Sequence, residues 1–289
     1  MVESPRFESI LLWGFALCLF EVLNHTSVSI AGDLELSAII SIVSQKGGVG
    51  KTTTAINLAS ALAVAEKDVL LVDLDPQGNA TSGLGIDKKS ISKSVYDTIT
   101  DETDPEAVVQ DTSIRFLKVL PAKMDLFMAE VDLRDRAHKE RLVTRLLDRL
   151  KTSYVYIFID APPSLGLLTF NALTAADYLV IPVQCGCYSL EAVEQMMQVV
   201  RVVQKRLNPG LIKACLLLTM YNSDEAICTE IEDALRQRFG EHIFETVIPF
   251  SRDLRDAGRH GAPLLLKDLN ASLTRGYFRV AREILRMTQ

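Results

Sequence analysis

The sequence has few of the features that mark secreted, fibrous or disordered proteins. Only five cysteines occur among 289 residues, without the paired spacing of a zinc site, as is usual for proteins of a reducing cytosol. Fifteen glycines and ten prolines are too few for a collagen-like or low-complexity chain. Basic residues are also in the minority, since 31 Lys and Arg face 37 Asp and Glu, and a net charge of −6 argues against a protein coated in nucleic acid. The remaining composition, 48% hydrophobic and 24% charged, is that of a globular protein.

Residues 1–37 differ from the rest of the chain. Their apolar run, Ile10 to Phe20, is shorter than the roughly 20 residues of a membrane-spanning helix. Glu3, Arg6 and Glu8 make the start slightly acidic, whereas a signal peptide begins with basic residues. We therefore expect residues 1–37 to be an extension that is disordered or not native to the protein. A short helix covering an apolar surface and an association with a membrane are the alternatives.

Residues 38–289 alternate short apolar runs with helical patterns. Buried strands are predicted at 38–44, 69–72, 116–120, 154–159, 178–183, 212–219 and 243–248. Helices are predicted at 52–65, 141–150, 166–176, 189–207 and 225–239. This order predicts an α/β fold with a mainly parallel sheet and helices on both faces. No linker rich in Pro, Gly or Ser divides residues 38–289, which we therefore expect to form one domain.

A glycine-rich loop lies between the first predicted strand and the first predicted helix, with the sequence Lys46-Gly47-Gly48-Val49-Gly50-Lys51-Thr52-Thr53. A strand, such a loop and a helix in this order are typical of a phosphate loop. The glycines allow several backbone N–H groups to face one anion, and the helix N-terminus adds partial positive charge. Lys51 would reach the β- and γ-phosphates of a nucleotide, and the Thr52 hydroxyl would ligate Mg²⁺.

Three aspartates end predicted buried strands, where open α/β sheets place their ligand sites. Asp160 fits a carboxylate that holds Mg²⁺ directly or through water. Asp73 and Asp75 could orient waters of Mg²⁺ or the attacking water, and Asp73 could instead cap a turn or helix. After Asp160, the segment 161–164 contains two prolines, and such a stiff segment could respond to the γ-phosphate.

The loop departs from the general phosphate-loop pattern, because Gln45 replaces the first glycine and Lys46 adds a second lysine. This combination resembles the deviant Walker A motif of the ParA/MinD family of dimerising ATPases. Further stretches resemble the same family: VLLVDLDPQGNATSGLG (69–85), YIFIDAPPSLGLLTFNALTAAD (156–177), IPVQC (181–185), LLTMYN (217–222) and TVIP (246–249). The resemblance spans residues 39 to about 285 and is closest to the Soj-type ParA proteins that partition chromosomes and plasmids.

This resemblance implies a P-loop ATPase that uses ATP and Mg²⁺, with a catalytic set of Lys46, Lys51 and Asp75. Lys46 would cross to the partner subunit's nucleotide, so that two nucleotides lie inside a two-fold dimer, and Asp75 would position the attacking water. Asn222 and Pro249 would border the adenine ring. The residues themselves leave open an exposed Lys46 and an Asn222 that only forms a turn.

The resemblance also implies a cytoplasmic, nucleoid-associated switch that binds DNA non-specifically with ATP bound. A ParB-like centromere-binding protein would stimulate its hydrolysis. The sequence departs from the family at two places. Family members usually have basic residues there, whereas this chain has Ser223-Asp224-Glu225 at one and Phe250 at the other. The remaining candidates for DNA binding are Arg252, Arg255 and Arg259.

A basic helix face is the other feature of the C-terminal region. Arginines recur there at spacings of four, three and four, at Arg275, Arg279, Arg282 and Arg286. A solvated helix face is the alternative interpretation. A second functional class is a MinD-like positioning ATPase anchored on a membrane or a protein scaffold. We expect no stable membrane association, because no separate apolar and basic tail follows the last helix. A third class, an ATP-dependent ligase, would need a substrate pocket that the sequence does not identify.

Overall fold

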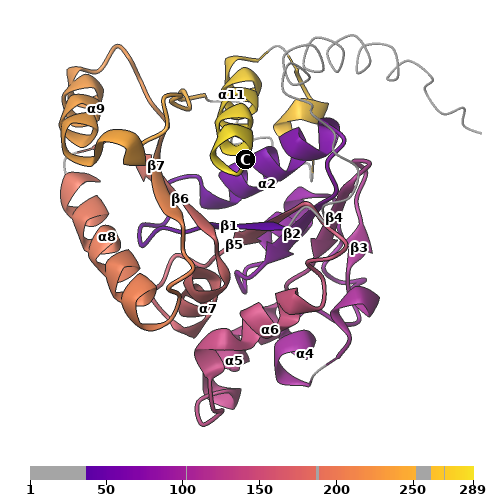
Figure 1. The fold of residues 1–289 in the computed structure, drawn as a ribbon. Helices are drawn as coiled ribbons and strands as arrows, with labels where there is room; N and C mark the ends of the chain where they lie inside the picture. The colour runs from indigo at the N-terminus through magenta and orange to yellow at the C-terminus, as the bar shows by residue number, and fades with distance from the viewer. Residues whose placement is uncertain (1–36, 102, 187–188, 252–261, 270) are drawn as a thin grey trace, which may run out of the picture.

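The computed structural model describes residues 37–101, 103–186, 189–251, 262–269 and 271–289 (Figure 1). Residues 1–36 of the N-terminal extension, and the DNA-binding candidates Arg252, Arg255 and Arg259, lie outside the described residues. Within the described part, no helix is both long enough and apolar enough to cross a membrane.

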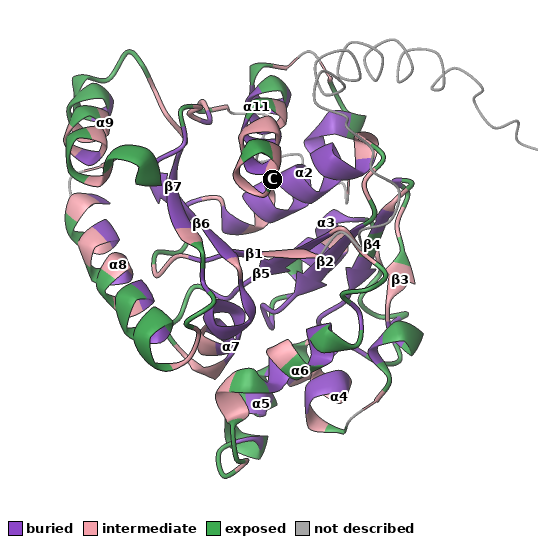
Figure 2. Cartoon of the chain, in the orientation of Figure 1, coloured by how far each residue is buried: buried purple, intermediate pink, exposed green. Residues whose placement is uncertain are grey.

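The centre of the fold is a seven-stranded sheet in the order β3-β4-β2-β5-β1-β6-β7. The strands are β1 (Ala38–Ile42), β2 (Val69–Asp73), β3 (Gln110–Asp111), β4 (Leu117–Leu120), β5 (Tyr156–Asp160), β6 (Tyr178–Gln184) and β7 (Lys213–Thr219). All neighbouring strands pair in parallel except β3 and β4. Every residue of β2 and β5 is buried, as expected for Val-, Ile- and Leu-rich strands covered on both faces (Figure 2).

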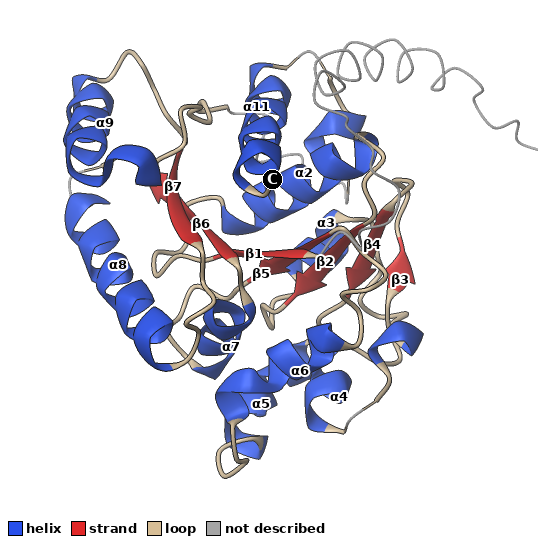
Figure 3. Cartoon of the chain, in the orientation of Figure 1, coloured by secondary structure: helices blue, strands red, loops and turns tan. Residues whose placement is uncertain are grey.

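Helices cover both faces of this sheet (Figure 3). The α-helices are α2 (Lys51–Val64), α3 (Asn79–Gly83), α4 (Val95–Thr100), α5 (Ala129–Asp132), α6 (Leu142–Asp148), α7 (Leu167–Ala175), α8 (Ser189–Arg206), α9 (Ala226–Phe239) and α11 (Ser272–Met287). The 3₁₀-helices are η2 (Pro105–Ala107), η3 (Met124–Met128), η4 (Lys139–Arg141), η5 (Gly240–His242) and η7 (Leu264–Leu266). One apolar core joins the sheet to α2 and α11, and a second joins its other face to α4 through α8.

The predicted α/β fold with a mainly parallel sheet is therefore confirmed. The prediction of a strand at residues 243–248 is wrong. This segment lies beside β7 but pairs with it discontinuously, through a bridge of Ile243 to Leu216 and a hydrogen bond from the Ile248 N–H to the Leu218 carbonyl at 2.8 Å. Between them, the backbone N–H groups of Glu245 and Thr246 donate to the Glu283 carboxylate of α11, at 2.8 and 3.0 Å. A side chain thus takes the hydrogen bonds that a continuous ladder would need.

Candidate functional site

The glycine-rich loop leaves β1 and enters α2 through two residues in left-handed conformation. Gly48 has φ 78° and Gly50 has φ 88°, a region that favours glycine. Gly50 is also the N-cap of α2, and no side chain caps this helix. The first backbone N–H groups of α2 are consequently left for an anion, together with the helix dipole.

The end of β7, two strands away from β1, fixes the position of the loop. The Thr219 hydroxyl, at the end of β7, donates a hydrogen bond of 2.8 Å to the Val49 carbonyl. Thr219 and Val49 are both buried, so this bond is shielded from water. Thr219 could not be singled out from the sequence, because a threonine at a strand end has no motif of its own.

Lys51 lies almost fully buried at the start of α2, with 7% of its surface exposed. Its ammonium donates to the Lys46 carbonyl at 3.2 Å. Burial lowers the pKa of Lys51, while the nearby carboxylates of Asp160 and Asp75 raise it. The loop therefore holds a cation that faces two carboxylates and is available to an anionic ligand.

Asp160 ends β5 beside Asp73, its partner in the register of β2. The side chain is fully buried, and no described group makes a hydrogen bond of standard geometry to either carboxylate oxygen. Burial and then the charge of Asp73 raise its pKa well above the usual value, whereas the nearby Thr52 hydroxyl, as a hydrogen-bond donor, and the charge of Lys51 lower it. A buried carboxylate beside a hydroxyl is a set of oxygen ligands that fits Mg²⁺.

The described side chains near Asp160 do not by themselves complete the coordination of a metal ion. Among the described residues, no group of three or more His, Cys, Asp or Glu side chains is placed to hold a metal ion. Mg²⁺ sites commonly take one or two protein ligands and complete their coordination with phosphate oxygens and waters. Thr52 and Asp160 fit such a site, in which the ion depends on a nucleotide.

The two aspartates at the end of β2 have different environments. Asp73 is fully buried and accepts hydrogen bonds from the Thr81 backbone and hydroxyl, both at 2.7 Å, and from the Asp75 N–H at 3.2 Å. Burial raises its pKa to about 6, against the hydrogen bonds from Thr81 and Asp75. Asp73 therefore holds α3 against the sheet, which is the capping alternative that the sequence had left open.

Asp75 keeps one carboxylate oxygen free of such contacts. Its Oδ1 accepts the Gln77 N–H at 2.9 Å, whereas no hydrogen bond is formed by Oδ2 among those described. The residue is 7% exposed and close enough to Lys51 to affect its pKa. A partly free carboxylate beside the phosphate-binding lysine can accept a hydrogen bond from water. The role of Asp75 in positioning water stays a prediction.

Asn222 and Pro249, the residues expected at the base, lie side by side, because Tyr221 bridges Pro249. The Asn222 amide donates to Glu225 Oε1 at 2.9 Å, and its carbonyl oxygen accepts the Asp224 N–H at 3.3 Å. Asn222 thus forms a turn in this structure. An asparagine amide has a second N–H and a second carbonyl lone pair, so these contacts are compatible with a contact to the edge of a base.

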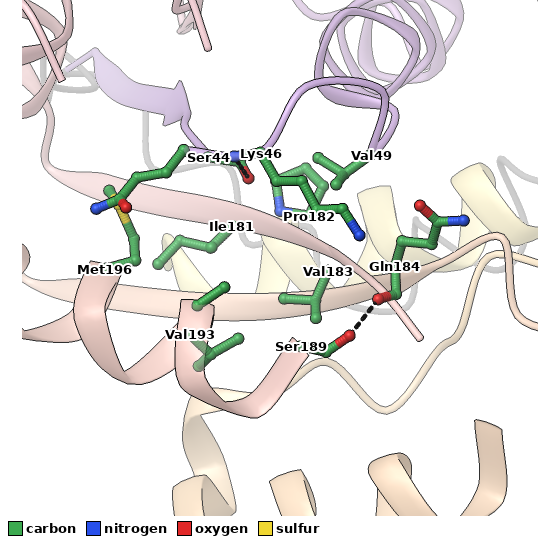
Figure 4. A pocket seen from close by; sticks show the side chains of 12 residues that line it. Ser44, Lys46, Val49, Ile181, Pro182, Val183, Gln184, Ser189, Val193 and Met196 are labelled. Carbon is green, nitrogen blue, oxygen red and sulfur yellow. Dashed lines mark hydrogen bonds between the residues drawn. The ribbon is translucent and has the colours of Figure 1, made fainter. Parts of the chain in front are cut away.

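A pocket opens next to Lys46, between the loop, the end of β6 and the first turns of α8 (Figure 4). Its walls are mostly apolar, with Ile181, Val183 and Met196 among the lining residues. Lys46 is exposed, and its side chain extends over this pocket toward Gln184. The role of Lys46 in contacting a second subunit stays a prediction.

The C-terminal helix α11 has the two faces that its pattern predicts. Its apolar face is buried against α2, where Tyr277 Oη lies 3.4 Å from the Thr54 hydroxyl. Arg275, Arg279 and Arg286 are exposed, whereas Arg282 is only partly exposed. The exposed arginines provide a basic strip on the outer side of this helix.

A family model and two curated relatives each match most of this chain. Residues 37–213 match the family model described as an AAA domain. The chain is 44% identical to the sporulation initiation inhibitor protein Soj of Bacillus subtilis over 249 residues, which cover 86% of this chain and 98% of that protein. It is 42% identical to the chromosome partitioning protein ParA of Myxococcus xanthus over 248 residues, covering 86% of this chain and 88% of the relative.

Solved structures with the same fold include two with bound nucleotide. A cobyrinic acid a,c-diamide synthase from Mycobacterium smegmatis, with ADP and magnesium, has a TM-score of 0.75 and 32% identity, covering 87% of this chain and 95% of that one. A putative plasmid partition protein from Borrelia burgdorferi, bound to AMPPNP, has a TM-score of 0.74 and 27% identity. The match covers 87% of this chain and 99% of that protein.

Proposed function

Because the chain belongs to the ParA/Soj family of partitioning ATPases, we propose that it is an ATP-driven switch that partitions chromosomes or plasmids. In this proposal it binds ATP with Mg²⁺, closes into a two-fold dimer and hydrolyses ATP slowly. A ParB-like centromere-binding protein accelerates the hydrolysis.

The arrangement of Lys51 and Asp160 is the observation that carries this proposal. The Lys51 ammonium at the start of α2 and the Asp160 carboxylate at the end of β5 are both buried, and their charges interact. In the proposed site, the phosphates lie on the loop N–H groups and Lys51, while Thr52 and Asp160 hold Mg²⁺. The metal would supply charge neutralisation at the phosphates, and Asp75 would orient the attacking water.

Lys46 supports the proposed dimer. A second lysine beside Lys51 is repelled by it unless an anion lies between them, and the side chain of Lys46 is exposed. A two-fold arrangement would bring this ammonium to the nucleotide of the other subunit. Each site would then be complete only in the dimer, which ties hydrolysis to association.

The first prediction is that Lys46→Ala leaves a folded monomer that binds ATP but neither dimerises nor hydrolyses it. Binding should persist because Lys51 donates to the backbone carbonyl of residue 46, which the substitution leaves in place. Light scattering after size-exclusion chromatography with Mg²⁺ and ATP measures the dimer, with Lys89→Ala as an exposed control. An ATP-induced dimer of the Lys46→Ala protein would refute the contact across the interface.

DNA binding is proposed from the basic side chains of the C-terminal region. The exposed Arg275, Arg279 and Arg286 of α11 support a DNA-facing surface, to which Arg252, Arg255 and Arg259 would add outside the described residues. Contacts of this kind recognise phosphates without reading sequence.

Binding to a random-sequence duplex should therefore require ATP and weaken steeply with salt, by about tenfold or more between 50 and 200 mM for several phosphate contacts. Fluorescence anisotropy with ATP, ADP and no nucleotide measures this dependence. Replacing both Arg275 and Arg279 with Glu should abolish the binding and leave the ATP-dependent dimer intact. Equal DNA binding by the ADP and ATP forms would contradict the proposed switch.

A further inference from the structure

Two cysteine side chains from different elements contact each other beside the end of β6. Cys185 directly follows this strand and is partly exposed, whereas Cys228 lies in the first turn of α9 and is 2% exposed. Their thiols form a side-chain hydrogen bond, although the two residues are far apart in the sequence. Both thiols are free. We call these two residues the cysteine pair.

The packing of the fold holds the elements that carry the cysteine pair together. Gln184 pairs with Thr219 in the register of β6 and β7, so Cys185 lies beside the end of β7, from which the chain leads into α9. In turn, α9 packs on α8 (Figure 1), where Arg238 of α9 forms an ion pair of 2.6 Å with Glu194 of α8. The contact between the two thiols is therefore built into the arrangement of the sheet and these helices.

The surroundings keep the Cys185 thiol protonated. Burial raises the pKa of Cys185 to about 12, and the Cys228 thiol and the charge of Glu232 add to this shift, while a backbone hydrogen bond opposes it. Tyr221, which shares a hydrogen bond with Glu232, is close enough to be affected by Cys185. Cys185 is therefore a neutral thiol at pH 7 and lacks the thiolate that a catalytic cysteine needs.

A metal site and a disulfide are two kinds of chemistry open to facing thiols. A structural zinc site takes four ligands, but among the described residues no group of three or more His, Cys, Asp or Glu side chains is placed to hold a metal ion. A disulfide needs only the two sulfur atoms, at about 2.05 Å from each other. Most of the movement can fall on Cys185, which is partly exposed at a strand end, whereas Cys228 is buried in a helix.

We propose that Cys185 and Cys228 are a site of reversible disulfide formation that ties the end of β6 to α9. Disulfides of proteins in contact with a glutathione pool are usually transient and respond to the redox state. The effect would reach the pocket beside Lys46, because Gln184, which precedes Cys185, lines that pocket. A movement of Cys185 toward α9 would shift this wall. The disulfide should therefore weaken the ATP-dependent dimer, and this part of the proposal rests on the proposed function.

The oxidant is the disulfide of a small thiol, such as oxidised glutathione. The Cys185 thiol loses its proton to water, and its thiolate attacks one sulfur of the oxidant, which releases one small thiolate that takes up a proton. Cys228 then loses its proton and attacks the Cys185 sulfur of the mixed disulfide, which releases the second small thiol. Two electrons pass from the cysteine pair to the oxidant. Because the high pKa of Cys185 keeps its thiolate scarce, the exchange should be slow at pH 7.

The full chain is incubated at pH 8 with different ratios of reduced to oxidised glutathione until the products no longer change. Mass spectrometry of non-reduced peptides identifies the disulfide, and light scattering with Mg²⁺ and ATP measures the dimer. We expect a Cys185–Cys228 disulfide that forms in oxidising buffer and is lost in excess reduced glutathione. It should persist in Cys215→Ala, the matched control at a buried thiol of β7, and be absent from Cys185→Ala and Cys228→Ala. The oxidised chain should dimerise about tenfold more weakly than the reduced chain.

The other outcomes decide against the proposal. Two free thiols in the most oxidising buffer would show that the cysteine pair only fills space in the fold. A disulfide of Cys185 with Cys187, which lies outside the described residues, or a glutathione adduct that goes no further, would also overturn it. Equal dimer formation by the oxidised and reduced chains would refute the link to the pocket beside Lys46. A reduced chain without an ATP-dependent dimer would refute the proposed function instead, while the peptide analysis would still test the disulfide.

Discussion

Replacing Lys51 with Ala should prevent ATP from binding at micromolar concentrations. The ammonium is buried, and the loop places it where the β- and γ-phosphates of a nucleotide would lie. Loss of a desolvated charge from an ionic hydrogen bond costs about 3–5 kcal/mol, or roughly two to four orders of magnitude in Kd. Lys51→Gln should fail as well, because a neutral amide does not replace the charge.

Isothermal titration calorimetry with Mg²⁺ and ATP measures this loss. Lys118→Ala is the matched control, because Lys118 is half-exposed on β4 and pairs with the exposed Asp111. Circular dichroism should show that the Lys51 variants remain folded. Unchanged ATP affinity in a folded Lys51→Ala protein would show that the glycine-rich loop is only a turn before a helix.

Much of the fold was predictable because the apolar runs are long and regular. Strands such as β2 and β5 are buried on both faces, so their sequences contain no polar alternation that could confuse them with surface strands. The failure at residues 243–248 has a local cause. Its pattern is that of a strand, but Glu283, far away in the sequence, takes the hydrogen bonds of Glu245 and Thr246. No local pattern contains this information.

In the candidate site, too, features that depend on neighbours in the sequence could be predicted, whereas features that depend on contacts between distant residues could not. The residues of the phosphate loop could be predicted, since their chemistry depends on neighbours in the sequence. Asp73 and Asp75 look equivalent in the sequence, and only the contact with Thr81 separates the capping residue from the free one. Thr219 holds the loop through a contact with Val49 that arises from the packing of distant elements. Such partners become visible only after the chain is folded.

Replacing Asp75 with Ala should separate ATP binding from hydrolysis. The loop backbone, Lys51 and Thr52 hold the nucleotide in the proposed site, whereas Asp75 has a free carboxylate oxygen to orient the attacking water. Loss of such a group lowers the rate by about 10²–10⁴, or ~3–5 kcal/mol at the barrier. ATP affinity should stay the same or improve, because a negative charge near the γ-phosphate is removed. The variant should therefore accumulate as an ATP-bound dimer.

Asp75→Asn distinguishes this role from a structural one. An asparagine can still accept the Gln77 N–H that Asp75 Oδ1 accepts at 2.9 Å, but it carries no charge to hold the attacking water. Both variants should bind ATP in calorimetry, form the dimer in light scattering and release phosphate at least a hundredfold more slowly than the unmodified protein. If Asp75→Asn restored normal turnover while Asp75→Ala did not, the carboxylate would serve only the turn at Gln77. The attacking water would then have to be oriented by another group.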